Sequence, residues 1–175
     1  MRSEDTLEAP MMGQRVTWLP DPEGAGDELL RFSFWMRGGA SPPPLHVHAR
    51  QQERLEVISG SVRSLSGGVE RVLGPGESIA TPAGEAHTVG PAGEDAVEMI
   101  VEFRPPLGFK DFVERTFALD RAGHLNANGR GSPLRMASAR PHEAEFFLPR
   151  VPIGLQRAVL RGLDRLGQSL PGTQR

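Results

Sequence analysis

Hydrophobic and polar side chains alternate along short stretches in the first two thirds of the chain. The clearest alternation covers residues 29–37, where one face carries Leu30, Phe32, Phe34 and Met36. Residues 96–103 repeat the pattern with Val97, Met99, Val101 and Phe103. A period of two with one polar face is typical of a half-buried antiparallel strand. We therefore predict a strand at each place.

Shorter strands with frequent turns are predicted around and between these two. Glycine and proline residues separate the stretches 15–19, 45–48, 54–59, 62–65, 70–73 and 77–81. Gly67-Gly68 is a two-residue hairpin signal, because two glycines accept the positive φ angles of a tight turn. Turns at intervals of about 8–12 residues are typical of a sandwich or a barrel. Residues 15–105 are therefore predicted to form an all-β domain.

The pattern changes after residue 105. Residues 107–121 and 153–170 place hydrophobic side chains at helical spacing, and residues 133–138 predict a shorter helix. The chain thus divides into an N-terminal arm (1–14), mobile or loosely docked, a β domain (15–105) and a C-terminal helical extension (106–175).

The last predicted helix carries two stripes. Its hydrophobic stripe comprises Leu155, Val159, Leu163, Leu166 and Leu170, and its basic stripe comprises Arg157, Arg161 and Arg165. A basic amphipathic helix can bind a membrane surface or a nucleic acid. We favour the simpler arrangement, in which the helix packs on its own barrel and the arginines face solvent.

Composition narrows the possible functions. The 175 residues include 20 basic and 22 acidic side chains, a formal net charge of −2, which argues against a dedicated nucleic-acid binder. No hydrophobic run approaches the roughly 20 residues of a membrane span, and the acidic N-terminus lacks the apolar stretch of a signal peptide. We expect a cytoplasmic protein without nucleic-acid or membrane partners. Cysteine is absent, which excludes disulfides and thiolate sites.

Three histidines and one glutamate are the candidate functional residues. His46 and His48 are two positions apart, so on a strand both imidazoles point to the same face. Strict alternation would put Glu53 on the opposite face, but a turn at 49–52 can bring it back beside the histidines. A tight turn at Gly84 can send His87 along a neighbouring strand. The four side chains are then able to converge.

Such a set suits one divalent transition metal held by His46, His48, Glu53 and His87. Neutral imidazole is a ligand for iron, nickel, copper and zinc, and one carboxylate offsets part of the cation's charge. Four protein ligands leave one or two positions for substrate or dioxygen on a five- or six-coordinate metal, whereas four ligands alone satisfy zinc. Manganese and cobalt fit the same ligands, so the sequence does not choose the metal.

The spacing of these residues resembles the two sequence motifs of the cupin superfamily. The first motif is Gly39, six residues, His46-Val47-His48, four residues, Glu53, six residues and Gly60. The second is Gly76, five residues, Pro82-Ala83-Gly84, two residues and His87. The first spacer is one residue longer than in the family, and the family's closing asparagine is Pro91 here.

This resemblance covers about residues 28–105 and implies a fold. It predicts a double-stranded β-helix, or jelly-roll, barrel like that of small bacterial single-domain cupins, followed by a C-terminal helical extension. Cupins of this size often pair edge strands, so a homodimer is expected from the resemblance.

The resemblance also implies a function. Our leading hypothesis is a metal-dependent dioxygenase of the quercetinase-like kind that acts on a small organic molecule, with Glu53 also moving a proton. A metal-dependent isomerase or lyase would use the same metal as a Lewis acid without oxygen. A non-catalytic cupin would bind a small molecule or the metal without turnover.

Three residues near the motifs have a second interpretation. Gln52 is the rival of Glu53 for the fourth ligand position, but the six-residue spacing to Gly60 favours Glu53. Glu56 is expected on the outward face of its strand. Glu85 could accept a proton at the mouth of the barrel, and we favour a solvated turn residue.

The remaining candidates have no motif to support them. His124 and His142 lie in polar stretches and are expected at the surface. The hydrophobic faces of residues 29–37 and 96–103 could line a cavity or fill the barrel, and both can hold at different depths. Trp18 and Trp35 could pack in a dimer interface or within the chain.

Overall fold

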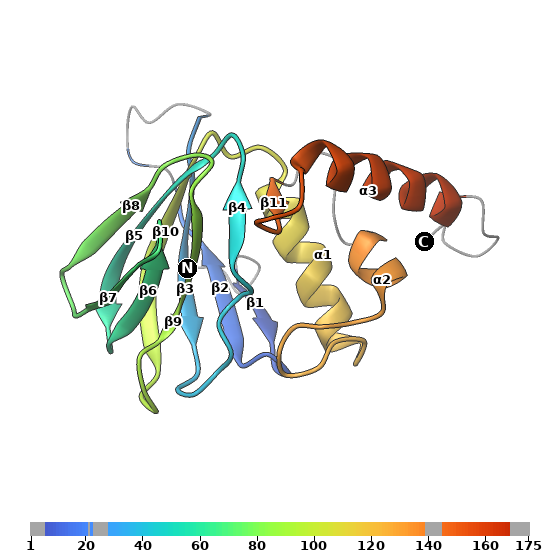
Figure 1. The fold of residues 1–175 in the computed structure, drawn as a ribbon. Coiled ribbons are helices and arrows are strands. Elements are labelled where there is room, and N and C mark those ends of the chain that lie inside the picture. The colour runs from blue at the N-terminus through green and yellow to red at the C-terminus, as the bar shows by residue number, and fades with distance from the viewer. Residues whose placement is uncertain (1–5, 21, 23–27, 139–144, 169–175) are drawn as a thin grey trace.

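The structure is a computed structural model that describes residues 6–20, 22, 28–138 and 145–168 (Figure 1). Across these residues, two antiparallel sheets form a β body and three helices lie together at one side of it. The first sheet has the strand order β1 (Thr6–Ala9), β2 (Gln14–Trp18), β3 (Leu30–Met36), β10 (Val97–Arg104), β5 (Gln52–Ser59) and β8 (Ser78–Thr81). The second has the order β11 (Phe146–Phe147), β4 (His46–His48), β9 (Ala86–Pro91), β6 (Val62–Ser66) and β7 (Val69–Leu73). The predicted jelly-roll barrel with a helical extension is confirmed.

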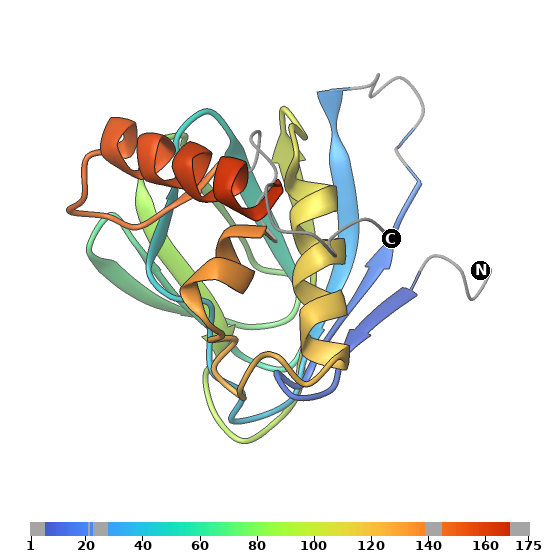
Figure 2. The same ribbon diagram turned by 90° about the vertical axis from the view of Figure 1, so that its right-hand side faces the viewer.

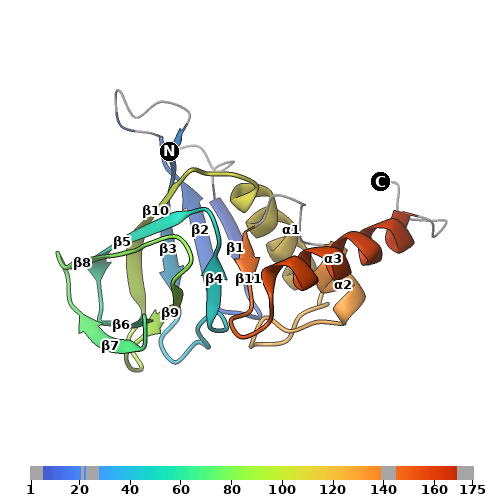
Figure 3. The same cartoon turned by 45° about the horizontal axis from the view of Figure 1, so that its top comes forward.

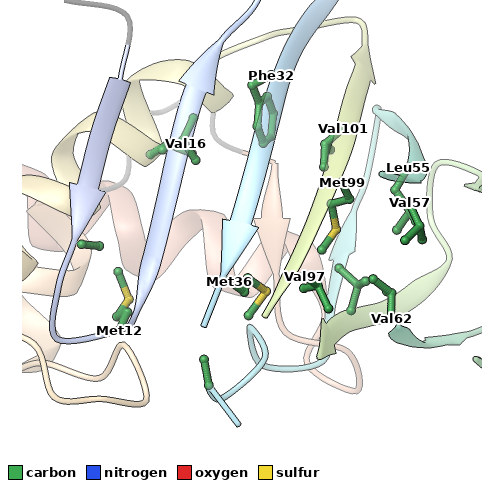
Figure 4. Close-up of a cluster of buried hydrophobic side chains, with 14 of the residues drawn as sticks. Met12, Val16, Phe32, Met36, Leu55, Val57, Val62, Val97, Met99 and Val101 are labelled. Atoms are coloured by element: carbon green, nitrogen blue, oxygen red, sulfur yellow. The ribbon is translucent and has the colours of Figure 1, made fainter. Parts of the chain in front are cut away.

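The core lies between the two sheets. The inward side chains of β3 and β10 pack there, and Met36, Val97 and Met99 have no exposed surface. Figure 4 shows these residues together with Leu55 and Val57 from β5. The alternation that predicted both long strands therefore identifies the buried face correctly, because successive side chains of a strand point to opposite sides.

The helices are α1 (Phe109–Arg121), α2 (Pro133–Ser138) and α3 (Ile153–Gln168). Figure 2 shows all three on the side of the molecule that faces the viewer. α1 lies against β1, and its Val113 and Phe117 belong to the core. None of the helices in the described part of the chain has the length and hydrophobicity of a membrane span.

Residues 6–14 differ from the arm expected at 1–14. β1 pairs with β2 at the edge of the first sheet. Ala9 and Met12 are buried, and the Asp120 carboxylate on α1 accepts hydrogen bonds from the backbone N–H groups of Met11 and Met12 at 3.0 and 3.1 Å. The segment is fixed by partners 108 and 109 positions away, which no local sequence pattern reveals.

α3 also differs from expectation. Leu155 and Val159 are 56% and 52% exposed, so this part of the hydrophobic stripe faces solvent and not the barrel. The helix contacts α2, and Figure 3 shows it extending away from the β body. Arg157, which was expected to face solvent, forms an ion pair with Glu145, a buried residue just before β11. Leu163, Arg165, Leu166 and Leu170 lie outside the residues whose side chains the structure describes.

Candidate metal centre

Three strands bring the four predicted ligands together. His46 and His48 share one face of β4, and the pairing of β4 with β9 puts His46 opposite His87. Glu53 enters from β5 in the other sheet. All four side chains are buried, with exposed fractions between 1% and 7%. We call these four residues the ligand cluster.

The turn between β4 and β5 sets the position of the carboxylate. Gln51 is buried there, and its side-chain amide donates to the backbone oxygens of Pro105 and Pro106 at 3.0 and 2.7 Å. This fixed turn brings Glu53 inward and leaves Gln52 exposed. The structure therefore places Glu53, and not its rival, in the ligand cluster.

A glycine makes the second turn possible. Gly84 has a φ of +86°, a conformation that other residues rarely adopt, and its N–H donates to the backbone oxygen of His48 at 2.8 Å. The turn thus ties the start of β9 to the end of β4. His87 then follows on β9 at the level of His46.

The distances within the ligand cluster fit a metal ion. The Nε2 atoms of His46 and His48 are 3.1 Å apart, and Glu53 Oε2 lies 3.3 Å from His48 Nε2 and 2.9 Å from His87 Nε2. Ligand atoms about 2.1 Å from one metal are about 3.0 Å apart at a right angle and about 3.4 Å apart at a tetrahedral angle. The four ligand atoms all lie within 4.8 Å of one another.

Hydrogen bonds orient each imidazole toward the centre. The Nδ1 atoms of His46, His48 and His87 donate to the backbone oxygens of Pro44, Glu145 and Glu85 at 2.8, 3.1 and 3.0 Å. A carbonyl oxygen only accepts, so each Nδ1 carries the hydrogen and each neutral ring presents an Nε2 lone pair. Lone pairs that face each other repel unless a cation or proton lies between them. The donor set therefore fits a bound metal.

The pKa values follow from burial and from the single carboxylate. Burial, and then the neighbouring His48 and His87, lower the pKa of His46 to about 3. Burial alone would raise the pKa of Glu53, but the neighbouring His48 and His87 outweigh it and hold that pKa below its usual range. Burial alone would lower the pKa of His87, but Glu53 outweighs it and raises that pKa.

Comparison with known families agrees with this geometry. The profile of a family described as the cupin domain matches residues 34–103, which include the whole ligand cluster. Residues 34–103 of the chain are therefore a cupin domain. A comparison with curated protein sequences gave no match.

The chain is also similar to solved structures at low sequence identity. An RmlC-like cupin from Shewanella frigidimarina is 24% identical over 60% of this chain and 88% of that one, with a TM-score of 0.50. A predicted oxalate decarboxylase from Thermotoga maritima is 19% identical over 59% and 96%, with a TM-score of 0.49. A protein described as a sugar phosphate isomerase from Silicibacter pomeroyi is 24% identical over 55% and 62%, with a TM-score of 0.47. The likeness to the Shewanella structure shows the fold and leaves the activity open.

The helical extension adds a strand to the cupin barrel beside the ligand cluster. β11 pairs with β4, with Phe146 opposite His48. The Phe146 ring stacks on the imidazole of His46, with ring centres 4.1 Å apart and planes 13° from parallel. Phe103 and Phe109 contact the edge-on ring of His48. The sequence pattern does not reveal this strand, because two residues are too few to show an alternation.

A buried carboxylate holds the new strand in place. Glu145 is 1% exposed, and its side chain accepts hydrogen bonds from Arg50 at 2.8 and 3.0 Å and from Arg157 at 2.8 and 3.2 Å. Gln156 adds hydrogen bonds to both backbone groups of Leu148. α3 therefore fixes residues 145–148, which we call the support segment, and the backbone oxygen of Glu145 fixes the ring of His48.

A cavity of about 590 Å³ opens onto the ligand cluster. Strand residues including Phe32, Phe34 and Val101 line it on the barrel side, whereas Met36 and Met99 do not. Hence the faces of β3 and β10 line a cavity at one depth and fill the core at another, as expected. Its size suits a small organic molecule.

Of the other candidate residues, Glu56 and His124 lie as expected and Glu85 differs. Glu56 points outward and binds Arg54 at 2.9 Å, and His124 is exposed. Glu85 is more than a solvated turn residue, because its carboxylate accepts a hydrogen bond from Ser66 at 2.5 Å. His142 lies outside the described residues.

Both tryptophans have contacts within the chain. The ring of Trp18 packs edge-on against Phe32, with ring centres 5.4 Å apart, and Lys110 lies over it at 5.3 Å. The guanidinium of Arg15 lies 5.1 Å from the ring centre of Trp35. Each tryptophan therefore packs against other side chains of the same chain.

Proposed function

We propose that this cupin is a metal-dependent enzyme of the dioxygenase kind that acts on a small organic molecule. One observation carries the proposal: three imidazole nitrogens and a carboxylate converge at the buried end of a cavity of about 590 Å³. Four protein ligands leave a coordination position for a substrate oxygen on a five- or six-coordinate metal. A bound metal would supply Lewis acidity for an enol or catechol oxygen and, if redox-capable, electron transfer toward dioxygen.

The chain's own residues would orient the substrate and move a proton. Glu53 is the one acidic residue among the described residues that line the cavity, so its carboxylate is placed to take the proton of a substrate hydroxyl. The rings of Phe103, Phe109 and Phe146 surround the histidines and exclude water from this end. A low-dielectric surrounding strengthens the attraction between a substrate oxyanion and a cation.

Elemental analysis of the purified, untagged protein by plasma mass spectrometry tests the metal. We expect about one redox-capable metal per chain in the native protein and its loss in a His46→Ala control. Zinc alone would favour the isomerase, lyase or binding-protein hypotheses. Absence of any metal after reconstitution would contradict an enzyme of this kind.

Oxygen dependence tests the reaction class. The metal-loaded protein is incubated with catechols, flavonols and diketones while an oxygen electrode records uptake. We expect conversion that stops under anaerobic conditions. Conversion that continues without oxygen would replace the dioxygenase with an isomerase or lyase. Binding without conversion, with the affinity kept in His48→Ala, would indicate a binding protein.

A further inference from the structure

One wall of the cavity is a continuous face of α1. Phe109, Phe112, Val113, Thr116 and Phe117 all line the cavity, at the three- and four-residue spacing that puts side chains on one face of a helix. Four of these side chains are hydrophobic. The hydrophobic face that predicted this helix therefore serves partly as the wall of a binding cavity.

The cavity is long, and its two ends differ in burial. Phe109 marks the metal end, because its ring centre lies 5.7 Å from that of His48. Thr116 follows seven residues later on the same face, about 10 Å further along the helix axis. The loop with Asn128 and Arg130, which are both exposed, also lines the cavity. Its Gly129 lies against Met12, whose backbone N–H donates to Asp120, one turn beyond Thr116. The metal end is thus buried, and the far end meets solvent.

The far end is polar and cationic. Arg130 supplies a positive charge, and the described lining residues include no acidic side chain at this end. Ser41 and Asn128 add polar side chains to the lining. The positive charge favours a ligand with an oxyanion.

The far wall is built to a fixed shape. The carboxamide oxygen of Asn126 accepts hydrogen bonds from the backbone N–H groups of Asn128 and Arg130, each at 3.0 Å. Ser41 donates to Asn128 at 2.5 Å and joins this loop to the barrel. Gly129 has a φ of +66°, and a Cβ there would lie 2.9 Å from the sulfur of Met12. The loop that carries Arg130 therefore has a defined place against the barrel.

We propose that the cavity binds an elongated aromatic acid, with an oxygen donor at the metal end and a carboxylate at the far end near Arg130. Aromatic rings that line the cavity, among them Phe32, Phe34 and Phe112, would contact the ligand's ring. The proposal rests on the proposed function only for the metal that receives the oxygen donor. A carboxylate at the solvent-facing end keeps part of its hydration, so its binding costs less than full burial would.

Three probes separate the two ends. Caffeate carries a catechol at one end and a carboxylate at the other, methyl caffeate lacks the charge, and catechol lacks the whole arm. Isothermal titration calorimetry measures each affinity for the zinc-loaded protein, in which zinc cannot oxidise the catechol. We expect caffeate to bind about five- to tenfold more tightly than methyl caffeate, with the preference falling as salt concentration rises.

Matched variants assign the preference to the far end. Arg130→Met should remove the preference for caffeate over its ester and leave the affinity for catechol unchanged. Arg161→Met, an exposed arginine on α3, is the control and should keep the wild-type affinities.

The outcomes separate this inference from the proposed function. Equal affinities for caffeate and methyl caffeate, or a preference that survives in Arg130→Met, would overturn the inference. A preference that depends on Arg130, combined with no oxygen uptake by the iron-loaded protein, would support the inference and count against the dioxygenase. Failure of all three probes to bind the metal-loaded protein would overturn both.

Discussion

The two regions that build the metal centre differ in how their positions are encoded. The ligand cluster comes from residues 46–87, on regular strands and at the spacing of two motifs. The support segment, residues 145–148, lies 97 positions from His48 at its closest contact and includes a strand of two residues. The strands of the first region carry the imidazoles. The support segment contacts the same rings through a hydrogen bond to His48 and ring stacking on His46.

This difference separates the choice of ligands from their orientation. A strand with period two is sufficient to bring His46 and His48 to one face. It does not determine how the imidazole rings are rotated. That is decided by acceptors such as the Glu145 backbone oxygen and by the ring of Phe146. Such outer partners tune metal affinity without binding the metal.

Removal of a metal ligand should lower metal affinity more than any change in the support segment. We expect His46→Ala and His87→Ala each to lower metal affinity by more than about a hundredfold, which exceeds the usual cost of losing an outer partner. His124→Ala is the matched control, because this histidine is exposed and outside the cluster. Metal titration with plasma mass spectrometry checks the result. Equal occupancy in all three variants would show that the ligand cluster is assigned wrongly.

Acidification should lower metal affinity through the ligands themselves. The support segment contacts His48 through a backbone oxygen, which does not titrate in this range. Metal binds deprotonated imidazole, and Glu53 raises the pKa of His87, so protons compete there at a higher pH than at an ordinary histidine. Metal affinity should therefore fall from pH 7.5 to pH 5.5, by up to about tenfold per pH unit for each proton taken up. His46, with a pKa lowered to about 3, adds nothing in this range. Equilibrium dialysis at a series of pH values measures the slope, and a flat profile would contradict the prediction.

Loss of Arg157 should have a smaller effect that comes only from the support segment. We expect Arg157→Ala to weaken metal affinity by about tenfold, because Glu145 loses one of its two arginine partners and its backbone oxygen is less well fixed. The visible absorption bands of the cobalt-loaded protein should shift as well, since the rotation of His48 changes the ligand field.

The control for this variant is Arg161→Ala, one turn further along α3, which should leave affinity and bands unchanged. Arg157→Lys should restore part of the affinity because it keeps the charge. A change in thermal stability without any change in the cobalt bands would reduce Arg157 to a purely structural residue.

The smallest effect is expected on the outer face of α3. Leu155→Ala and Val159→Ala should change the free energy of unfolding by less than about 0.5 kcal/mol, because both side chains are more than half exposed. Met99→Ala, in the core and with no exposed surface, should cost about 2–5 kcal/mol. Urea unfolding at two protein concentrations measures both. A larger, concentration-dependent loss at Leu155 would show that a second copy covers this face, as in the expected homodimer.

Particular residues show how far the sequence could be interpreted. The alternation in residues 29–37 and 96–103 predicts β3 and β10 with their buried faces, and Gly67-Gly68 predicts the β6–β7 hairpin. The choice of Glu53 over Gln52 also agrees with the structure, because the spacing to Gly60 reflects the register of β5. The expected packing of the last helix on the barrel is not found at Leu155 and Val159, since helical periodicity identifies a hydrophobic face without stating what lies against it.

By itself the sequence determined most of the strands, the helices and the identity of the ligand cluster, because each depends on short-range periodicity or fixed spacing. The tertiary structure alone decided three other features: the pairing of β1, the insertion of β11 beside β4, and the use of the α1 face as a wall of the cavity. Each requires contact between segments far apart in the chain. Such contacts are selected by the burial of hydrophobic surface and the satisfaction of backbone hydrogen bonds in the folded molecule, and local patterns do not record them.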